Sequence, residues 1–209
     1  MTHQTGIAEL DRKLGGGIPP GTLVAVEAPA RAQREPLLCA GADERSTTYF
    51  TTVRSEGAIA KQFERSAVNP DVENIVEVDP ESAPETVGEA LAKLSEGQDF
   101  IVDVVDPIED ALERQRYAAF LNDVTERLRD SDSIGYLHGY AGDRQSPQRQ
   151  VTLDVADFVW RLLPISARGE INYRLEIPKT NGLSLPPKDR SLEIQIGRDV
   201  DLDQTRNIG

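Results

Sequence analysis

The chain has 209 residues and a formal net charge of −13, from 36 acidic and 23 basic side chains. A chain of this length buries a sizeable core without disulfides, so we expect one domain over residues 1–198 and an acidic flexible tail over 199–209. The acid excess argues against direct nucleic-acid or anionic-membrane binding, because phosphate contacts need clustered Lys and Arg. One cysteine and two histidines exclude an intrachain disulfide and disfavour a zinc site.

The composition also bears on the environment of the protein. No apolar run approaches the length of a membrane span, and the N-terminus lacks the basic-then-apolar pattern of a secretory signal, so we expect a cytoplasmic protein. Only five basic residues are Lys, while Asp and Glu number 18 each. This balance is typical of a salt-loaded, haloarchaeal cytosol, where screening weakens the self-repulsion of an acidic surface. An ordinary acidic protein is the alternative.

Strands and helices are predicted to alternate along the first two thirds of the chain. Short continuous apolar runs are typical of strands buried on both faces, and apolar residues at helical spacing predict the helices. The alternation implies right-handed crossovers and a mostly parallel sheet. The predicted strands are 23–26, 47–53, 74–78, 100–105 and 133–137, and the predicted helices are 7–14, 36–42, 58–65, 84–94 and 111–129.

The last third of the chain has a different pattern. Apolar and polar residues alternate strictly over 171–177 and 192–196, as in strands with one solvated face, and 151–163 is rich in β formers without a helical period. We expect antiparallel strands that extend the edge of the parallel sheet. Polar loops are predicted over 145–150 and 178–190.

Three blocks of the sequence resemble the KaiC-type branch of the RecA-like ATPases. Residues 5–21 have the pattern TGI..LD..LGGGIP.G, and residues 100–103, FIVD, resemble a strand that ends in a Walker B aspartate. The third block begins with ADFV at 156–159 and continues with RLEIPKTNG at 174–182. The resemblance covers about residues 5–196. It implies an α/β, RecA-like P-loop fold, with a mostly parallel central sheet flanked by helices and antiparallel strands at the C-terminal edge.

The resemblance breaks down where the family's phosphate loop should follow the first strand. In the pattern G-x4-G-K-[ST], glycines let backbone N–H groups surround the phosphates, Lys reaches their oxygens and the hydroxyl binds Mg²⁺. Here Ala28 and Gln33 occupy the glycine positions, Arg34 the Lys position and Glu35 the Ser/Thr position. Side chains at the glycine positions block close approach. We expect the Glu35 carboxylate to take the place of the phosphate, paired with Arg34 or Arg31.

A second part of the ATPase machinery is missing after the second predicted strand. Similar ATPases carry acidic residues there, one of which activates the attacking water, whereas residues 51–55 read TTVRS and the nearest acid is Glu56. Asp103 remains as a Walker B-like residue, but without a Ser/Thr partner it is a poor Mg²⁺ ligand. We therefore expect no catalytic residue, no cofactor and no metal, with ATP and Mg²⁺ bound only if some nucleotide affinity survives.

Other chemistry-bearing residues receive structural interpretations. Cys39 is predicted to be a small core residue rather than a nucleophile, and His138 a strand-end histidine with a satisfied hydrogen bond rather than a general base. Trp160 is predicted to pack in the core or an interface. An acidic run is predicted to be solvated or to cap helix N-termini rather than to bind a metal. The run consists of Asp99, Asp103, Asp106, Glu109 and Asp110.

The favoured function is a non-catalytic (pseudo-ATPase) RecA/KaiC-like regulatory or protein-interaction module in signal transduction or transcriptional regulation. A protein partner or self-association is expected, because the antiparallel edge has to be covered or paired. One alternative is a residual ATP-binding ATPase that uses Arg34 and Asp103 in an altered site. Another is a DNA-repair accessory similar to RadA paralogues, against which stand the acidic charge and the lack of a DNA-reading motif.

Overall fold

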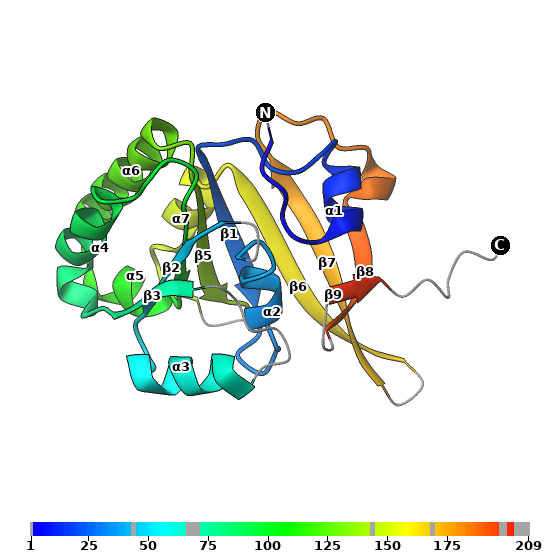
Figure 1. The fold of residues 1–209 in the computed structure, drawn as a ribbon, viewed down its shortest axis with the longest axis horizontal. Coiled ribbons are helices and arrows are strands. Elements are labelled where there is room, and N and C mark those ends of the chain that lie inside the picture. Colours follow the sequence, from blue (N-terminus) through cyan, green and yellow to red (C-terminus); the bar gives the residue numbers. More distant parts are fainter. Residues whose placement is uncertain are drawn as a thin grey trace.

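A central β-sheet with helices on both faces organises the molecule (Figure 1). The computed structural model describes residues 2–42, 45–65, 72–142, 145–167, 170–196 and 200–202, and in this part of the chain nine strands form one sheet. Their order is β3-β2-β4-β5-β1-β6-β7-β8-β9. The strands are β1 (Thr22–Ala28), β2 (Thr47–Thr51), β3 (Val72–Glu77), β4 (Asp99–Asp103), β5 (Ile134–Tyr140), β6 (Phe158–Ala167), β7 (Glu170–Thr180), β8 (Ser191–Ile196) and β9 (Val200–Leu202).

The sheet is parallel from β3 to β6 and antiparallel from β6 to β9. Every residue of β1, β2 and β4 is buried, as expected for strands covered on both faces. The prediction of a mostly parallel sheet, flanked by helices and extended by antiparallel C-terminal strands, is therefore confirmed.

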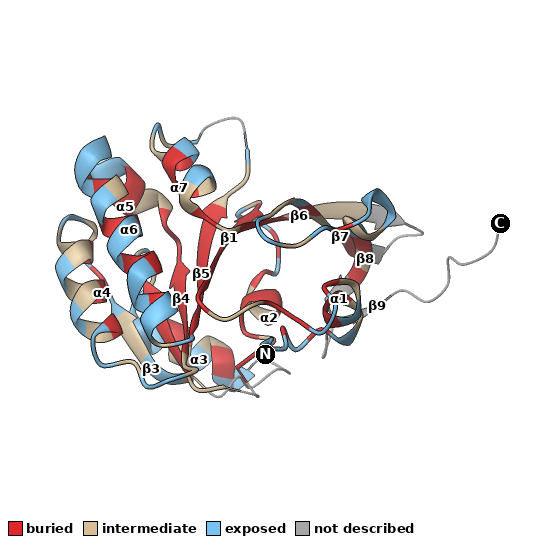
Figure 2. Cartoon of the chain, turned by 90° about the horizontal axis from the view of Figure 1, so that it is seen from above, coloured by how far each residue is buried: buried red, intermediate tan, exposed pale blue. Residues whose placement is uncertain are grey.

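The helices divide between the two faces of the sheet. Figure 2 shows α1, α2 and α3 on one side and α4, α5, α6 and α7 on the other, and each side buries its own apolar cluster against the strands. The helices are α1 (Ala8–Lys13), α2 (Glu35–Leu38), α3 (Glu56–Arg65), α4 (Ala83–Leu91), α5 (Asp106–Ala111), α6 (Arg114–Asp130) and α7 (Arg149–Val155), with single 3-10 turns η1 (Pro80–Ser82) and η2 (Pro187–Asp189).

Three predicted elements differ from the structure. The helix predicted over 111–129 is α6, but it begins only at Arg114, because Leu112 and Glu113 have extended backbones with ψ of 140° and 149°, and the short helix α5 before it was not predicted. The segment 151–163 was predicted without helical period, but its first five residues belong to α7. The helix predicted over 36–42 is only the single turn α2, so the loop after β1 leads into a very short helix.

The C-terminal segment adds a short strand at the edge of the sheet. Of the tail predicted over 199–209, Val200–Leu202 form β9 beside β8, and residues 199 and 203–209 lie outside the described residues. Among the helices that the structure describes, none has the length and apolar character needed to cross a membrane.

Candidate functional site

Asp103, the last residue of β4, lies at the centre of a buried group of polar side chains. Parallel pairing makes His138 of β5 its register partner, and His138 Nδ1 lies 2.7 Å from Asp103 Oδ1. Tyr49, in the neighbouring strand β2, donates its hydroxyl to Asp103 Oδ2 at 2.5 Å. The sheet thus fixes three of the interacting side chains, and all three are buried.

Two arginines from the loops that follow β1 and β2 complete this group. Arg34 donates from Nε to Oδ1 at 3.1 Å and from Nη2 to Oδ2 at 3.3 Å, which is a bidentate contact with Asp103. Arg54 donates from Nη2 to Oδ2 at 2.8 Å and also reaches Glu35 Oε1 at 3.2 Å. We call Asp103, His138, Tyr49, Arg34 and Arg54 the Asp103 cluster.

The Asp103 carboxylate has no acceptor site left for a metal ion. An ionised carboxylate offers about four lone-pair positions as acceptors. Five hydrogen bonds from the cluster already occupy them. Burial by itself raises the pKa of Asp103, but the hydrogen bond with His138 and the charge of Arg34 outweigh it and hold the pKa well below its usual value. The carboxylate is therefore ionised and neutralised from within the protein.

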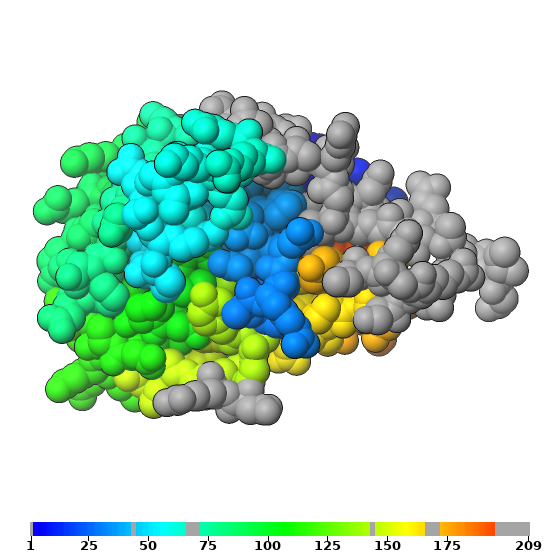
Figure 3. Space-filling view, turned by 90° about the horizontal axis from the view of Figure 1, so that it is seen from below, coloured from blue at the N-terminus to red at the C-terminus, as the bar shows by residue number. Residues whose placement is uncertain are grey.

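Backbone N–H groups of the loop between β1 and α2, which could otherwise bind a phosphate, are already engaged within the chain. Gln33 N–H donates to the hydroxyl of Tyr173 in β7 at 3.2 Å, and Ala32 N–H donates to the carbonyl of Pro29 at 2.8 Å. Pro36 has no N–H, and a helix as short as α2 has little dipole to offer an anion. Figure 3 shows the segment around α2 filling the surface between the α3 region and the β6–β7 region.

A cavity of about 240 Å³ remains beside the Asp103 cluster. Ala30, Val53 and Tyr140 line it together with both arginines of the cluster and Asp103. The volume is below the range of about 300–1,000 Å³ typical of small-molecule sites. The cavity is therefore smaller than a nucleotide site usually is.

The structure brings most of the predicted loop residues together but changes their roles. Glu35 was expected to replace the phosphate and to pair with Arg34 or Arg31. Arg34 does form the expected ion pair with Glu35, at 3.7 Å, but it also binds Asp103, and the nearer partner of Glu35 is Arg54. Ala28 is buried at the end of β1, and Gln33 has an exposed side chain.

Tyr49 and Arg54 are absent from the predicted site. Arg54 lies in the stretch 51–55, which lacks the acids of similar ATPases, and its position just after a buried strand is the signal that the sequence offers. The sequence offers no signal for Tyr49, because the contact with its partner depends on the strand order.

The acidic run behaves differently from the prediction. Asp99 and Glu109 are buried like Asp103, and each is paired with an arginine, so a solvated or capping role is wrong for these three. Asp106 bonds the Tyr140 N–H at 2.9 Å from the first turn of α5, and Asp110 is exposed. Within the described residues, no group of three or more His, Cys, Asp or Glu could hold a metal ion.

The remaining single-residue predictions have mixed outcomes. Cys39 is buried in the core, as predicted. His138 lies inside β5 rather than after it, and its Nε2 has no hydrogen-bond partner in the described structure although Nδ1 has one. Trp160 packs against Tyr136 with ring centroids 5.9 Å apart, which confirms a core position.

A second buried polar group surrounds Arg149 at the start of α7. Arg149 Nε donates to Glu109 at 2.9 Å, its Nη1 to the Tyr140 carbonyl at 3.0 Å, and its Nη2 forms an ion pair with Asp106 at 2.9 Å. The Thr152 hydroxyl also donates to Glu109. We call Arg149, Glu109, Asp106 and Thr152 the Arg149 cluster.

The Arg149 guanidinium lies against β5 near the carboxyl end of that strand. It lies directly against Gly139, where an added Cβ would be 2.3 Å from the guanidinium. A side chain at this position would therefore push the guanidinium away from its place. Burial raises the pKa of Glu109 despite its contacts with Arg149.

Comparison with known proteins gives a family but no activity. The chain matches the model described as "Family of unknown function (DUF7125)" over residues 2–209. A search of the curated proteins finds no match. Because the family model covers nearly the whole chain, the protein belongs to the DUF7125 family.

Proposed function

We propose that the protein is a non-catalytic RecA/KaiC-like regulatory or protein-interaction module, a pseudo-ATPase acting in signal transduction or transcriptional regulation. The sequence resemblance assigns the loop after β1 and the aspartate that ends β4 to one site. The distance of 3.1 Å between Arg34 Nε and Asp103 Oδ1 supports that assignment. The proposal is that this site keeps its position in the fold and has lost its ligand.

The observation that carries the proposal is the internal neutralisation of Asp103. Mg²⁺ would need the carboxylate oxygens that Arg34, Arg54, His138 and Tyr49 already occupy. Removing one partner of a buried ion pair costs about 3–5 kcal/mol. A nucleotide that displaced Arg34 would lose a factor of more than about 10² in affinity at that step.

Calorimetry with Mg-ATP in molar KCl tests this proposal. We expect no saturable heat and no phosphate release. The triple change Gln33→Gly, Arg34→Lys and Glu35→Thr should restore weak binding at most. Ala28 still occupies a glycine position, and the stretch after β2 still lacks the acidic residues of the ATPases. Micromolar binding by the unmodified protein, or ATP turnover that disappears in Asp103→Asn, would overturn the proposal.

The cavity beside the cluster favours one alternative, residual nucleotide or anion binding. Arg54 lines the cavity and its side chain is 29% exposed, so part of its guanidinium is available to a ligand. The same titration decides between the two functions. Inorganic phosphate should be included as a second titrant, because it is small enough for a cavity of about 240 Å³.

A further inference from the structure

The turn that follows β7 holds the single Asn-Gly sequence of the chain, Asn181 and Gly182. Both residues are exposed, and Gly182 has a φ of 79°, where a side chain would be strained. An added Cβ at Gly182 would meet no atom within 4 Å, so the space around this glycine is open. The peptide bond between the two residues is therefore accessible to water.

Hydrogen bonds hold the chain on either side of this peptide bond but not the peptide N–H itself. The Asn181 N–H donates to the carbonyl of Asp157 at 2.9 Å, and the Thr180 hydroxyl donates to the carbonyl of Leu183 at 3.0 Å. Among the described residues, neither the Gly182 N–H nor the side-chain amide of Asn181 has a hydrogen-bond partner. The Gly182 nitrogen and the Asn181 side-chain amide, two groups that can react with each other, are thus both free.

We propose that Asn181 is a site of covalent modification, the spontaneous deamidation of its side chain through a cyclic imide. The backbone nitrogen of Gly182 loses its proton and attacks Cγ of Asn181, which closes a five-membered ring. The side-chain nitrogen takes up a proton and leaves as ammonia. Water then opens the ring at one of its two carbonyls and yields either aspartate or isoaspartate. Glycine at the second position leaves the attacking nitrogen unobstructed.

The two products have different consequences for the segment 181–190. Aspartate adds one negative charge, whereas isoaspartate adds the charge and also inserts a methylene group into the backbone. The segment lies beside α1 (Figure 1), places Leu185 in the core, and is tied to α1 by the ion pair of Asp189 with Lys13 at 3.0 Å. A longer backbone at the start of this segment should therefore displace its core contacts, while the charge alone should not.

The modification is independent of the site around Asp103. Thr180 pairs with Phe158, the first residue of β6, so the turn lies at the amino ends of the parallel strands. Asp103 is the last residue of β4 and lies at the opposite edge of the sheet. The nucleotide titration therefore neither supports nor weakens this proposal.

Incubation of the full chain at mildly alkaline pH in molar KCl, followed by peptide mass spectrometry, tests the proposal. We expect residue 181 to gain the mass difference between a hydroxyl and an amino group, at a rate proportional to the hydroxide concentration. An isoaspartyl methyltransferase should then transfer a methyl group from S-adenosylmethionine to the product. Asn74 of β3 and Asn122 of α6 are internal controls, because they are exposed but are followed by residues with side chains in regular structure. Both should stay unmodified while Asn181 is converted.

Three variants separate the chemistry from the fold. Asn181→Gln cannot close a five-membered ring, so position 181 should stay unmodified over the same time. Gly182→Ala should slow the reaction about tenfold, which corresponds to about 1.4 kcal/mol in the activation free energy. Asn181→Asp carries the charge without the added methylene and should keep the melting temperature of the fresh protein. The isoaspartate form should melt about 2–4 °C lower, the shift typical of a modest loss of stability in a chain of this length.

A parallel incubation in urea decides whether the folded turn permits the reaction. If the folded chain keeps Asn181 intact while the unfolded chain loses it, the turn protects this residue and the proposal is wrong. It is equally wrong if Asn74 or Asn122 reacts as fast as Asn181 in the folded chain, or if Gly182→Ala reacts as fast as the unmodified protein.

Discussion

The Asp103 cluster and the Arg149 cluster each neutralise a buried charge from within the chain, but the central charges have opposite signs. In the first, one carboxylate is surrounded by two guanidiniums, a phenol and an imidazole. In the second, one guanidinium is surrounded by two carboxylates and a carbonyl. Both lie at the carboxyl ends of parallel strands, close to where α/β proteins usually bind their ligands. Here, ion pairs within the chain occupy that region from both sides of β5.

The difference between the clusters appears in the acidity of their carboxyl groups. Asp103 receives enough hydrogen bonds and positive charge to overcome burial, and its pKa falls. Glu109 shares the single guanidinium of Arg149 with Asp106, and burial prevails, so its pKa rises. The direction in which the pKa moves therefore depends on whether hydrogen bonds and positive charges together outweigh burial.

Removing the central residue of each cluster should have the largest effect and should distinguish them by pH. We expect Asp103→Asn and Arg149→Leu each to lower the free energy of unfolding by about 3–5 kcal/mol at neutral pH, because buried charges lose their partners. Mild acid should restore part of the loss only in Arg149→Leu, since Glu109 can take up a proton whereas Arg34 and Arg54 cannot lose one. Urea unfolding at fixed molar salt, at neutral and mildly acidic pH, measures both.

The exposed neighbour Asp110 provides the control for this comparison. Asp110→Asn should change the free energy of unfolding by less than about 0.5 kcal/mol at either pH. An equal pH response of Asp103→Asn and Arg149→Leu would contradict the assignment of opposite charges to the two centres.

A smaller effect is expected in the unmodified protein on acidification. The pKa of Glu109 is raised above 4.5 in the folded state, so the folded chain binds this proton before the unfolded chain does. Its contribution therefore makes the protein more stable as the pH falls from neutral through the raised pKa toward 4.5. The gain in the free energy of unfolding is about 1.4 kcal/mol for every tenfold decrease in the acid dissociation constant of Glu109 on folding.

Asp103 acts in the opposite direction at lower pH. Its pKa is depressed in the folded state, so its stabilisation is complete above the ordinary value of 3.8 and is lost as the pH falls below it. Glu109→Gln should reduce the gain in mild acid and leave the loss below 3.8 unchanged, while the part of the gain that comes from Asp99, whose pKa burial also raises, should remain. Denaturant unfolding across this pH range checks both parts, and a gain that is undiminished in Glu109→Gln would contradict the role of Glu109.

The comparison of the two clusters also shows what the sequence could reveal about the site. The replacement of Lys by Arg34 and of Ser/Thr by Glu35 was evident from the aligned loop. The contact of Arg34 with Asp103 depends on β4 and β5 being neighbours near β1, which hydrophobic patterns cannot order. For the same reason Tyr49 and His138, each ordinary within its own strand, could not be paired with Asp103 in advance.

The fold was predictable to the extent that burial pattern determines it. Continuous apolar strands predicted the parallel part, and alternating residues predicted the antiparallel part. Helix α7 was missed because its buried side chains include Arg149 and Thr152, which count as polar in any hydrophobic pattern. The start of α6 was predicted at 111 rather than at Arg114 because the buried Leu112 continues the apolar spacing although its backbone is extended.

Salt should act on the surface and leave the difference between the clusters nearly unchanged. With a net charge of −13, the folded surface repels itself, and added ions screen this repulsion over a Debye length that falls from about 10 Å at 0.1 M to about 3 Å at 1 M. We therefore expect the melting temperature to rise with KCl, as for a protein from a salt-loaded cytosol. Asp103→Asn and Arg149→Leu should have lower melting temperatures than the unmodified protein. Their melting temperatures should rise with KCl in parallel with that of the unmodified protein, because buried pairs are screened much less.

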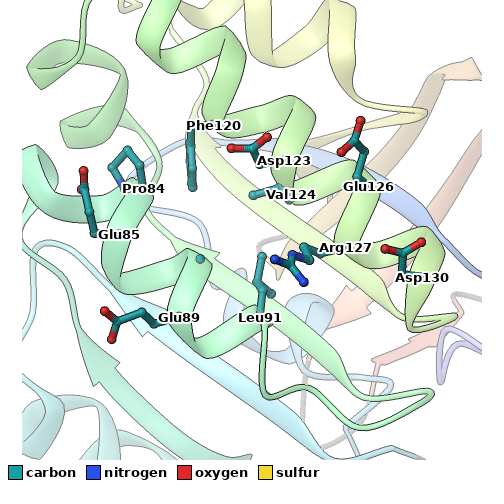
Figure 4. A pocket seen from close by; sticks show the side chains of 11 residues that line it. Pro84, Glu85, Glu89, Leu91, Phe120, Asp123, Val124, Glu126, Arg127 and Asp130 are labelled. Atoms are coloured by element: carbon teal, nitrogen blue, oxygen red, sulfur yellow. The ribbon is translucent and has the colours of Figure 1, made fainter.

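Charge reversals at the exposed residues Glu89 of α4 and Asp123 of α6 (Figure 4) provide the contrasting case. Glu89→Lys with Asp123→Lys lowers the excess negative charge on the surface, so the rise of the melting temperature with KCl should become shallower while both clusters stay intact. Thermal melts of the four proteins over the same salt series measure the slopes. A flat or falling midpoint in the unmodified protein would contradict the salt-adapted interpretation of its surface. A slope changed by Asp103→Asn but not by the two reversals at Glu89 and Asp123 would mean that screening reaches the buried cluster, and that the loop after β1 is more open to solvent than its contacts indicate.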